Sequence, residues 1–280
     1  MPHPLPSTQA LASPRATIVV RTIGAAQPIS WLFRAWHDLI RCGWISVLHG
    51  LAIALAGALM LWVARDHFWF MAGAFSGFLL VGPVLATSLY ALSRGLERSE
   101  KPSLAKVLET WLNWRSGRIQ PWGEAQWRLV RFGLLLALAG TAWVLISAGL
   151  IIWLAPVPIT SPLVFIQQVV LAKEGWLFES WLALGGALVA PIFASTVVTI
   201  PLLLDRQVSL GQAIAASWQV IFANPVPMAL WGALIMALTL LGFATALIGL
   251  VLLLPLLGHA SWHAYRDLLD VSALPEQEQR

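Results

Sequence analysis

Charged residues are scarce in this chain. Asp, Glu, Lys and Arg make up 11% of the 280 residues, while 59% are hydrophobic; soluble domains carry about 25% charged residues. A surface that faces water on all sides cannot be built from so few charges. Residues 207–265 and 132–172 contain no charged side chain at all, and each run exceeds the roughly 20 residues that one spanning helix needs. The lack of charge therefore indicates an integral membrane protein.

Cysteine is scarcer still, since Cys42 is the only one. A single cysteine cannot form an internal disulfide, and no second cysteine completes a CxxC metal or haem-attachment motif. The first residues also lack the apolar segment of a signal peptide. Residues 1–28 are rich in proline and are predicted to form a disordered tail, with a short extended piece at 16–24. A second disordered tail is predicted at 270–280.

Long apolar runs dominate the rest of the chain and predict an all-α fold. We expect a six-transmembrane helix bundle within a single membrane domain over residues 29–269. The last two spans must share residues 226–263, with a tight turn near "LLGFATA"; one long helix plus a short re-entrant piece is the alternative there. The predicted spans are residues 45–64, 68–92, 132–154, 181–204, 226–241 and 243–263.

Basic residues are distributed unevenly across this arrangement. All but two of the 17 Lys and Arg residues fall on the side of the chain ends, and the exceptions are Arg65 and Lys173. Because positive charge collects on the cytoplasmic side, both ends are predicted to lie in the cytoplasm, at a bacterial inner membrane. The same rule accounts for the net charge of +4, so no nucleic-acid partner is expected. The basic stretch 94–131 is a candidate contact for anionic lipid headgroups.

Tryptophan is abundant, with 16 residues. Most fall at the predicted span ends, where indole rings form aromatic belts at the headgroup level. Trp262, beside the basic Arg266, is one of them. Trp143 and Trp231 lie well inside their spans and are expected to pack in the core.

Three segments predict amphipathic helices in the cytoplasmic-side interface: residues 29–41, 103–111 and 209–218. Each has apolar side chains at helical spacing, and in the last one Ser209 and Gln212 match a capping box. Each carries one tryptophan on its apolar side, namely Trp36, Trp111 and Trp218. In the first segment the predicted apolar stripe is Leu32, Phe33, Trp36, Leu39 and Ile40, and the predicted polar face is Arg34, His37, Asp38 and Arg41.

Three predicted spans contain a proline: Pro83, Pro191 and Pro255. Together with the amphipathic segments they suggest a unit of interfacial helix, span and proline-bearing span that occurs three times, a pseudo-threefold repeat. A proline removes one helical hydrogen bond and bends the helix. The bend either shapes packing between helices or, as in transporters, builds a site at the membrane midplane.

Histidines are the candidate ligands. His259 and His263 are four residues apart and share a helix face, and His49 lies at a similar depth in the first span. Neutral imidazole binds haem iron or copper, so these three residues are a candidate haem or copper site. Otherwise the three form structural polar contacts, with His259 bonded across helices, for example to the carbonyl freed by Pro255. No other cofactor or metal site is predicted.

Acidic residues are absent from the interiors of the predicted spans, which counts against an ion-driven pump. No nucleophile arrangement, P-loop or HExxH motif is present, so the chain is predicted not to be an enzyme. The leading hypothesis is an accessory, assembly or lipid-interacting scaffold that contacts membrane lipids and a membrane-protein partner or a second copy. A carrier for an apolar or neutral solute and a haem or copper redox subunit are the alternatives.

Three stretches of the chain resemble one known family. They are "GFLLVGPVLATSLYALSRGLERSEKPSL", "IPLLLDR" and "LLLPLLGHASWHAYRDLL", and they resemble a family of bacterial polytopic integral membrane proteins of unknown function. The resemblance covers about residues 29–269, and the last stretch is its most specific part. It implies a multi-pass inner-membrane protein and no particular activity.

Overall fold

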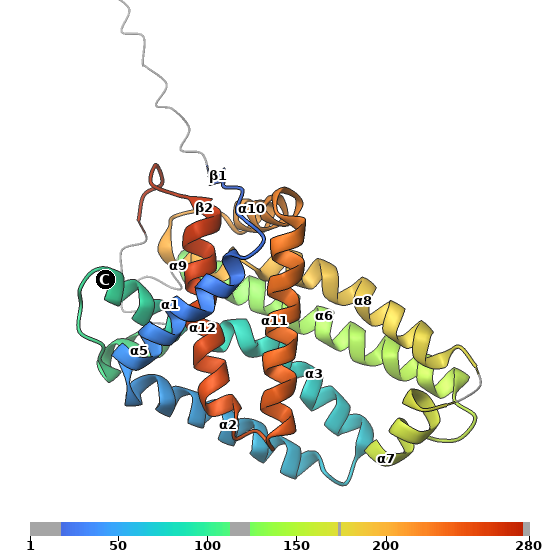
Figure 1. The fold of residues 1–280 in the computed structure, drawn as a ribbon. Helices are drawn as coiled ribbons and strands as arrows, with labels where there is room; N and C mark the ends of the chain where they lie inside the picture. Colours follow the sequence, from blue (N-terminus) through green and yellow to red (C-terminus); the bar gives the residue numbers. More distant parts are fainter. Residues whose placement is uncertain (1–17, 113–123, 173–174, 277–280) are drawn as a thin grey trace, which may run out of the picture.

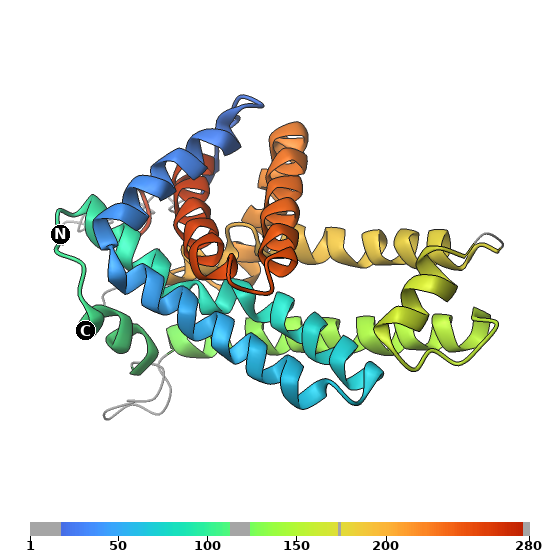
Figure 2. The same cartoon turned by 60° about the horizontal axis from the view of Figure 1, so that its bottom comes forward.

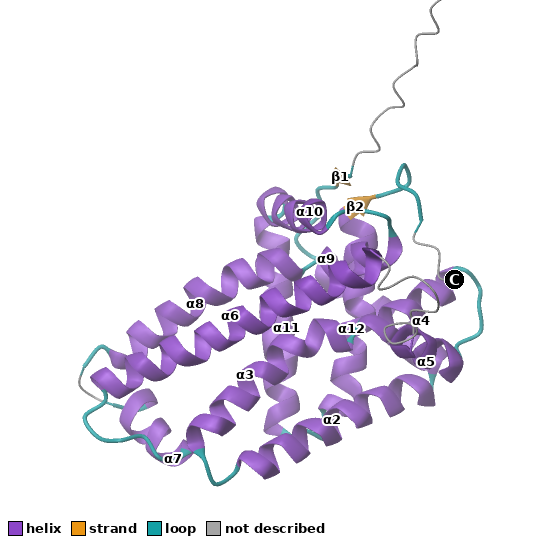
Figure 3. Ribbon diagram, turned by 180° about the vertical axis from the view of Figure 1, so that it is seen from behind, coloured by secondary structure: helices purple, strands orange, loops and turns teal. Residues whose placement is uncertain are grey.

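The fold is almost entirely helical, as the apolar patterning predicts (Figure 3). A computed structural model describes residues 18–112, 124–172 and 175–276. Its helices are α1 (Gln27–Cys42), α2 (Trp44–Ala64), α3 (Phe68–Leu85), α4 (Thr87–Glu97), α5 (Leu104–Leu112), α6 (Glu124–Leu154), α7 (Pro162–Phe165), the π-helical turn η1 (Ile166–Val170), α8 (Leu177–Thr196), α9 (Thr199–Asp205), α10 (Leu210–Ala223), α11 (Pro225–Ala244) and α12 (Leu250–Leu268).

Four stretches of the described chain are long and apolar enough to cross a membrane. They are Trp44–Ala64, Trp127–Leu154, Leu177–Asp205 and Pro225–Ala244. Their outward-facing side chains are mostly large and apolar, as lipid contact requires. The integral-membrane class therefore holds, while the count of six spans and the threefold repeat stay predictions.

The long helices run in two directions. Helices α6 and α8 lie alongside each other, and α2 and α3 form a second pair, whereas α11 and α12 run across them (Figures 1 and 2). Between α11 and α12 the chain reverses at residues 245–249, where Ala246 and Leu247 have positive φ angles of 51° and 70°. Residues 226–263 therefore form two helices with a tight turn, rather than one long helix and a re-entrant piece.

The predicted second span, 68–92, is wrong in its second half. Helix α3 ends at Leu85, two residues after Pro83, and the chain turns at Ala86 into α4. Helix α4 is buried over most of its length and includes Ser88, Ser93 and Arg94. Polar groups such as these need partners that protein supplies and lipid does not, so this segment packs inside the molecule instead of continuing across a bilayer.

Parts of the two segments predicted to be disordered tails are ordered. Strand β1 (Val19–Val20) pairs antiparallel with strand β2 (Leu269–Asp270), which confirms a short extended piece at the first tail. Arg21 and Asp270 form an ion pair of 2.7 Å across the strands, and Leu274 is buried. Residues 18–28 and 270–276 are therefore ordered, because the two segments form backbone hydrogen bonds and an ion pair with each other. Residues 1–17 and 277–280 lie outside the described part of the chain.

Helix α1 has two apolar faces rather than one. Trp31, Ala35 and Leu39 are buried, and α1 packs along α12. On the opposite side, an apolar stripe is exposed; it consists of Ile29, Phe33, Trp36 and Ile40. The prediction that Leu39 belongs to that stripe and Asp38 to the solvated face is wrong, because both side chains are buried.

The other two amphipathic segments form α5 and α10. Trp218 is half-buried and donates a hydrogen bond to Ser195 Oγ at 3.0 Å. Ser209 and Gln212 form the predicted capping box at the start of α10. Local pattern therefore identified all three helices, while their environment differs from one to the next.

Helix α12 lies at the centre, packed against α1, α2, α4 and α11. Pro255 has no N–H, so the carbonyl of Val251 loses its helical donor. Gly50 of α2 lies against this point: a Cβ there would be 2.1 Å from Val251 O and 2.8 Å from Pro255 Cγ. Glycine at position 50 thus allows α2 to approach α12 closely at Pro255. His259 does not form the bond to the Val251 carbonyl that the sequence suggested; it bonds to Ser46 and Ser93.

The opposite end of the long helices is built from aromatic rings. Phe68 and Trp69 follow the α2–α3 connection and form edge contacts with each other at 5.0 Å. Phe68 also contacts Phe165 of α7 at 5.9 Å, and Trp181 of α8 packs on Phe165 at 5.6 Å. We call this region, residues 65–69 and 155–181 as far as they are described, the far end.

Candidate functional site

Two of the three candidate histidines lie in one buried hydrogen-bonded chain. His263 Nε2 is 2.9 Å from Asp38 Oδ2, and Ser93 Oγ donates to the same oxygen at 2.7 Å. Ser93 Oγ is also 2.7 Å from His259 Nδ1, and His259 Nε2 is 2.9 Å from Ser46 Oγ. These hydrogen bonds join α1, α2, α4 and α12. We call the five residues, Asp38, Ser46, Ser93, His259 and His263, the histidine network.

The hydrogen positions in this network follow from counting donors. A serine hydroxyl has one hydrogen, and Ser93 donates it to Asp38. His259 must then donate its Nδ1–H to Ser93, which leaves Nε2 as an acceptor for the Ser46 hydroxyl. His259 is thereby held as one neutral tautomer between two serines.

Burial sets the chemistry of the network. Ser46, Ser93 and His259 have no exposed surface, and Asp38 and His263 have less than a tenth. Burial alone would raise the pKa of the Asp38 carboxyl, but hydrogen bonds from His263 and Ser93 outweigh it and hold that pKa below its usual value. Nearby, burial raises the pKa of the Cys42 thiol to about 11, so Cys42 stays protonated. The network is therefore an internal hydrogen-bonded structure with little or no exposed surface.

His49 belongs to a different set of contacts. Its Nε2 is 3.0 Å from the carbonyl oxygen of Leu85, and its Nδ1 is 3.3 Å from Ser88 Oγ. The carbonyl of Leu85 is at the end of α3, so His49 ties α2 to the α3–α4 break.

The three histidines are not arranged with other described side chains as a metal site. In residues 18–112, 124–172 and 175–276, no three His, Cys, Asp or Glu side chains are grouped so that they could hold a metal ion. Both ring nitrogens of His259 are already hydrogen-bonded. The donor set around His259 and His263, two serine hydroxyls and a carboxylate, suits protein hydrogen bonding better than haem or copper, which favour imidazole or sulfur ligands.

A second buried cluster lies beside the histidine network. Arg94 Nε is 2.9 Å from Asp205 Oδ1, and both side chains are almost fully buried. Tyr265 donates its hydroxyl hydrogen to Asp205 Oδ2 at 2.8 Å, and Arg206 Nε contacts the same oxygen at 3.0 Å. This cluster joins α4, α9 and α12. We call the region that holds both clusters the polar end.

The predicted interfacial pair of α12 proves to be part of the polar end. Trp262 is 1% exposed and donates its indole N–H to Glu97 Oε1 at 3.0 Å, so its assignment to the aromatic belt is wrong. Arg266 Nε is 3.3 Å from Glu97 Oε2. The carboxylate of Glu97 supplies the polar partner that a headgroup was expected to supply.

None of the three prolines is among the described residues that line the two cavities below. Pro191 lies inside α8 and Pro255 inside α12; Pro83 lies in α3. A cavity of about 10 Å³ lies between α2, α3 and α11, beside Gly57 and Phe243. It has no room for more than about one water molecule.

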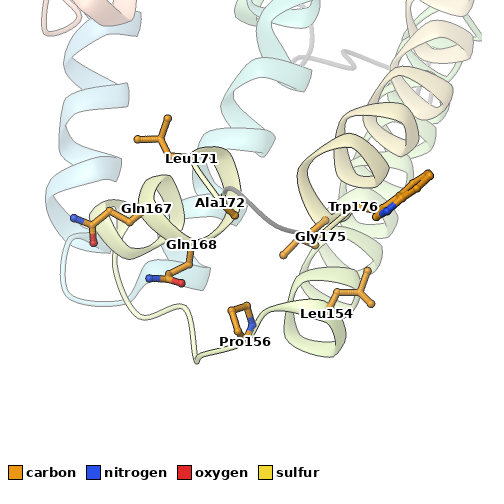
Figure 4. Close-up of a pocket in the computed structure, with 9 residues that line it drawn as sticks. Leu154, Pro156, Gln167, Gln168, Leu171, Ala172, Gly175 and Trp176 are labelled. Carbon is orange, nitrogen blue, oxygen red and sulfur yellow. The ribbon is translucent and has the colours of Figure 1, made fainter.

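A larger cavity, of about 640 Å³, opens at the far end. Figure 4 shows residues that line it on two sides: Gln167, Gln168 and Leu171 lie on one side, and Leu154 and Trp176 lie on the other. Residues 173 and 174 lie outside the described part of the chain. The lining residues that the structure describes include no titratable side chain.

Sequence reasoning missed most partners of the two clusters. Asp38 was assigned to a solvated face, and Ser46, Ser93 and Tyr265 were not singled out. One signal was present: Asp38, Cys42, Ser46 and His49 recur at intervals of four, four and three residues, which is one helical face. In the fold, Asp38 and Ser46 bond to the histidines of α12, whereas His49 bonds to the α3–α4 break.

Comparison with known proteins gives a family match over part of the chain. No curated protein and no solved structure is significantly similar to the chain. A family model covers residues 70–205. This range contains the first of the three resembling stretches and all of the second except its last residue, Arg206, but not the stretch around His259 and His263. Over residues 70–205, the chain matches the family described as "Predicted integral membrane protein (DUF2189)", whose function is unknown.

Proposed function

We propose that this protein is a non-enzymatic, multi-pass protein of the bacterial inner membrane that acts by contact, as an accessory or assembly factor or a lipid-interacting scaffold. The observation that carries the proposal is the apolar stripe of α1. Its four large side chains, Ile29, Phe33, Trp36 and Ile40, are between 45% and 68% exposed. A contiguous apolar patch on an amphipathic helix is typical of a membrane or protein contact surface.

Helix α1 holds this stripe in a fixed position. The Asp267 carboxylate accepts hydrogen bonds from Gln27 Nε2 and Trp31 Nε1, both at 2.8 Å, and it pairs with Arg34. Trp31 also packs edge-on against Trp231 of α11 at 5.4 Å. A surface that is already ordered loses less entropy on binding than a flexible one.

The charge distribution supports a cytoplasmic-side location for α1. Exposed His37 and Arg41 flank the stripe, and strands β1 and β2 bring the two ends of the described chain together. With positive charge favouring the cytoplasm, α1 would lie at the inner-leaflet headgroups, next to lipid or a membrane-protein partner.

The buried polar groups support a role without catalysis. The sequence placed no acidic residue inside a predicted span; Asp38, which precedes the first of these spans, is nevertheless buried, as is His259. Their hydrogen bonds run to other helices, and neither cavity described above adjoins them. They stabilise the arrangement of α1, α2, α4 and α12 that presents the stripe.

Site-specific photo-crosslinking in native membranes tests the proposal. A photoreactive residue at Phe33 should give adducts with lipid or with one recurrent membrane protein, and the same residue at His37, also exposed on α1, is the matched control. Equal labelling at both positions, or none at Phe33, would overturn the proposal. A Soret band in the purified protein would favour the haem subunit instead, and solute-dependent flux in proteoliposomes would favour the carrier.

A further inference from the structure

Three arginines converge on one carboxylate at the polar end. Glu276 Oε2 pairs with Arg98 Nη2, and it is 3.6 Å from Arg94 Nη2. Glu276 Oε1 is 3.6 Å from Arg206 Nη2. Arg94 is in α4, Arg98 directly follows α4 and Arg206 directly follows α9, so the site forms only in the folded protein.

Hydrogen bonds to Arg206 and Gln207 hold the segment that carries Glu276 in place. Gln207 N donates to the carbonyl of Pro275 at 3.0 Å, and Gln207 Nε2 donates to the carbonyl of Glu276 at 3.0 Å. Arg206 Nη1 donates to the carbonyl of Leu274 at 2.9 Å. These contacts place the Glu276 side chain over the arginines, where it remains about half exposed.

The Glu276 carboxylate does not form direct hydrogen bonds with all three arginines. At 3.6 Å, the contacts from Arg94 and Arg206 are too long for direct hydrogen bonds. Arg94 Nη2 is buried and has no hydrogen-bond partner. Without Glu276, three guanidinium groups would face one paired carboxylate, that of Asp205, and the site would carry a net positive charge.

We propose that the Arg94–Arg98–Arg206 site binds a phosphate-bearing anion and that the Glu276 carboxylate competes with it for the same arginines. A planar carboxylate offers two oxygens to three guanidinium groups that approach from different elements. A phosphate group offers more oxygens in a tetrahedral arrangement, and guanidinium groups bind it in bidentate geometry. The unpaired Nη2 of Arg94 is the donor that the larger anion would satisfy.

The phosphate group has two possible sources. It belongs either to the headgroup of an anionic lipid in the adjacent leaflet or to a soluble phosphate compound. Both present the same charge and oxygens to the arginines, so binding measurements must separate them. The site is distinct from the α1 stripe, and a negative crosslinking result at Phe33 would leave it standing.

The experiment compares four forms of the full-length protein: the unchanged chain, Glu276→Gln, Glu276→Gln with Arg98→Gln, and Glu109→Gln. Glu109 is exposed on α5, so its replacement makes the same charge change away from the site. Native mass spectrometry measures retained phosphatidylglycerol against phosphatidylcholine, and thermal unfolding measures stabilisation by inorganic phosphate. Glu276 and Arg98 are about half exposed, so folded protein is expected for each variant, and the unfolding curve without ligand checks it.

Removing the competing carboxylate should tighten anion binding about threefold, in line with the modest strength of exposed ion pairs. Adding Arg98→Gln should remove the gain, and Glu109→Gln should leave binding unchanged. A gain for phosphatidylglycerol alone identifies a lipid headgroup, and a gain for inorganic phosphate identifies a soluble ligand. No gain with either probe, or an equal gain in Glu109→Gln, would overturn the proposal.

Discussion

The polar end and the far end hold their helices together by different means. At the polar end, buried charged and polar side chains connect elements distant in sequence, as in the Arg94–Asp205 pair and the His263–Asp38 bond. At the far end, the described ion pair, Arg65–Asp66, joins adjacent residues and is exposed on both sides. Packing there comes from rings such as Phe68 and Phe165.

This difference indicates the structural role of the few charged residues in the chain. Charges that lie in adjacent exposed positions contribute little to stability, whereas buried pairs become costly as soon as one partner is lost. In a protein with 11% charged residues, concentrating them at one end both marks the predicted cytoplasmic side and joins α1, α4, α9 and α12. The far end needs no such connection, because its loops link helices that are neighbours in sequence.

The largest expected effect comes from Asp205→Asn. The change leaves the buried Arg94 guanidinium without its counter-charge, and we expect a loss of about 3–5 kcal/mol in the free energy of unfolding. Equilibrium unfolding in mixed detergent micelles, followed by tryptophan fluorescence, measures it. Asp66→Asn makes the same chemical change at the far end and should cost less than about 1 kcal/mol. Similar losses for the two variants would mean that the ends do not differ in the way described.

A smaller loss is expected for His259→Ala. Removing the ring leaves the buried hydroxyl of Ser46 without its acceptor and that of Ser93 without a donor, which costs about 1–3 kcal/mol. His67→Ala, exposed at the far end, is the matched control and should be near neutral. A double-mutant cycle with Ser93→Ala should show coupling. Additive effects would contradict a connected network.

The sequence predicted those features of the fold that depend on local pattern. The helical class, the capping box of Ser209 and Gln212, the three amphipathic helices and the turn before α12 each depend on neighbouring residues. The helix face shared by His259 and His263 also followed from their spacing. Their partners did not, because Ser46, Ser93 and Asp38 lie more than 160 residues away in the chain.

The spacing of apolar residues also could not predict which neighbouring element covers each face of a helix. Helix α1 has apolar residues on two sides, and only the position of α12 decides that Trp31 is buried while Trp36 is exposed. In the same way, the apolar pattern continues through Ala86 without a break, although α4 turns inward there. Trp262 has the surroundings of an interfacial tryptophan in sequence, and Glu97, 165 residues away, makes it a buried one.

The smallest effect concerns the pH dependence of the contact between α1 and α12. Burial would raise the pKa of the Asp267 carboxyl, but hydrogen bonds from Arg34, Gln27 and Trp31 outweigh it and hold that pKa below its usual value of about 4. A carboxyl whose pKa is lowered by folding stabilises the protein above its unfolded pKa, and this contribution is lost as the pH falls toward the folded pKa.

Asp267→Asn should therefore cost about 1–2 kcal/mol at pH 7 and progressively less as the pH falls below about 4, so that its unfolding free energy approaches that of the unchanged protein. Micelle unfolding at pH values from about 7 down to 3 measures both curves. Asp66→Asn, at the far end, should run parallel to the unchanged protein across this range. If the Asp267→Asn deficit is instead the same at every pH, the carboxylate charge of Asp267 does not stabilise α1 against α12, and the shape of the amide alone explains the loss.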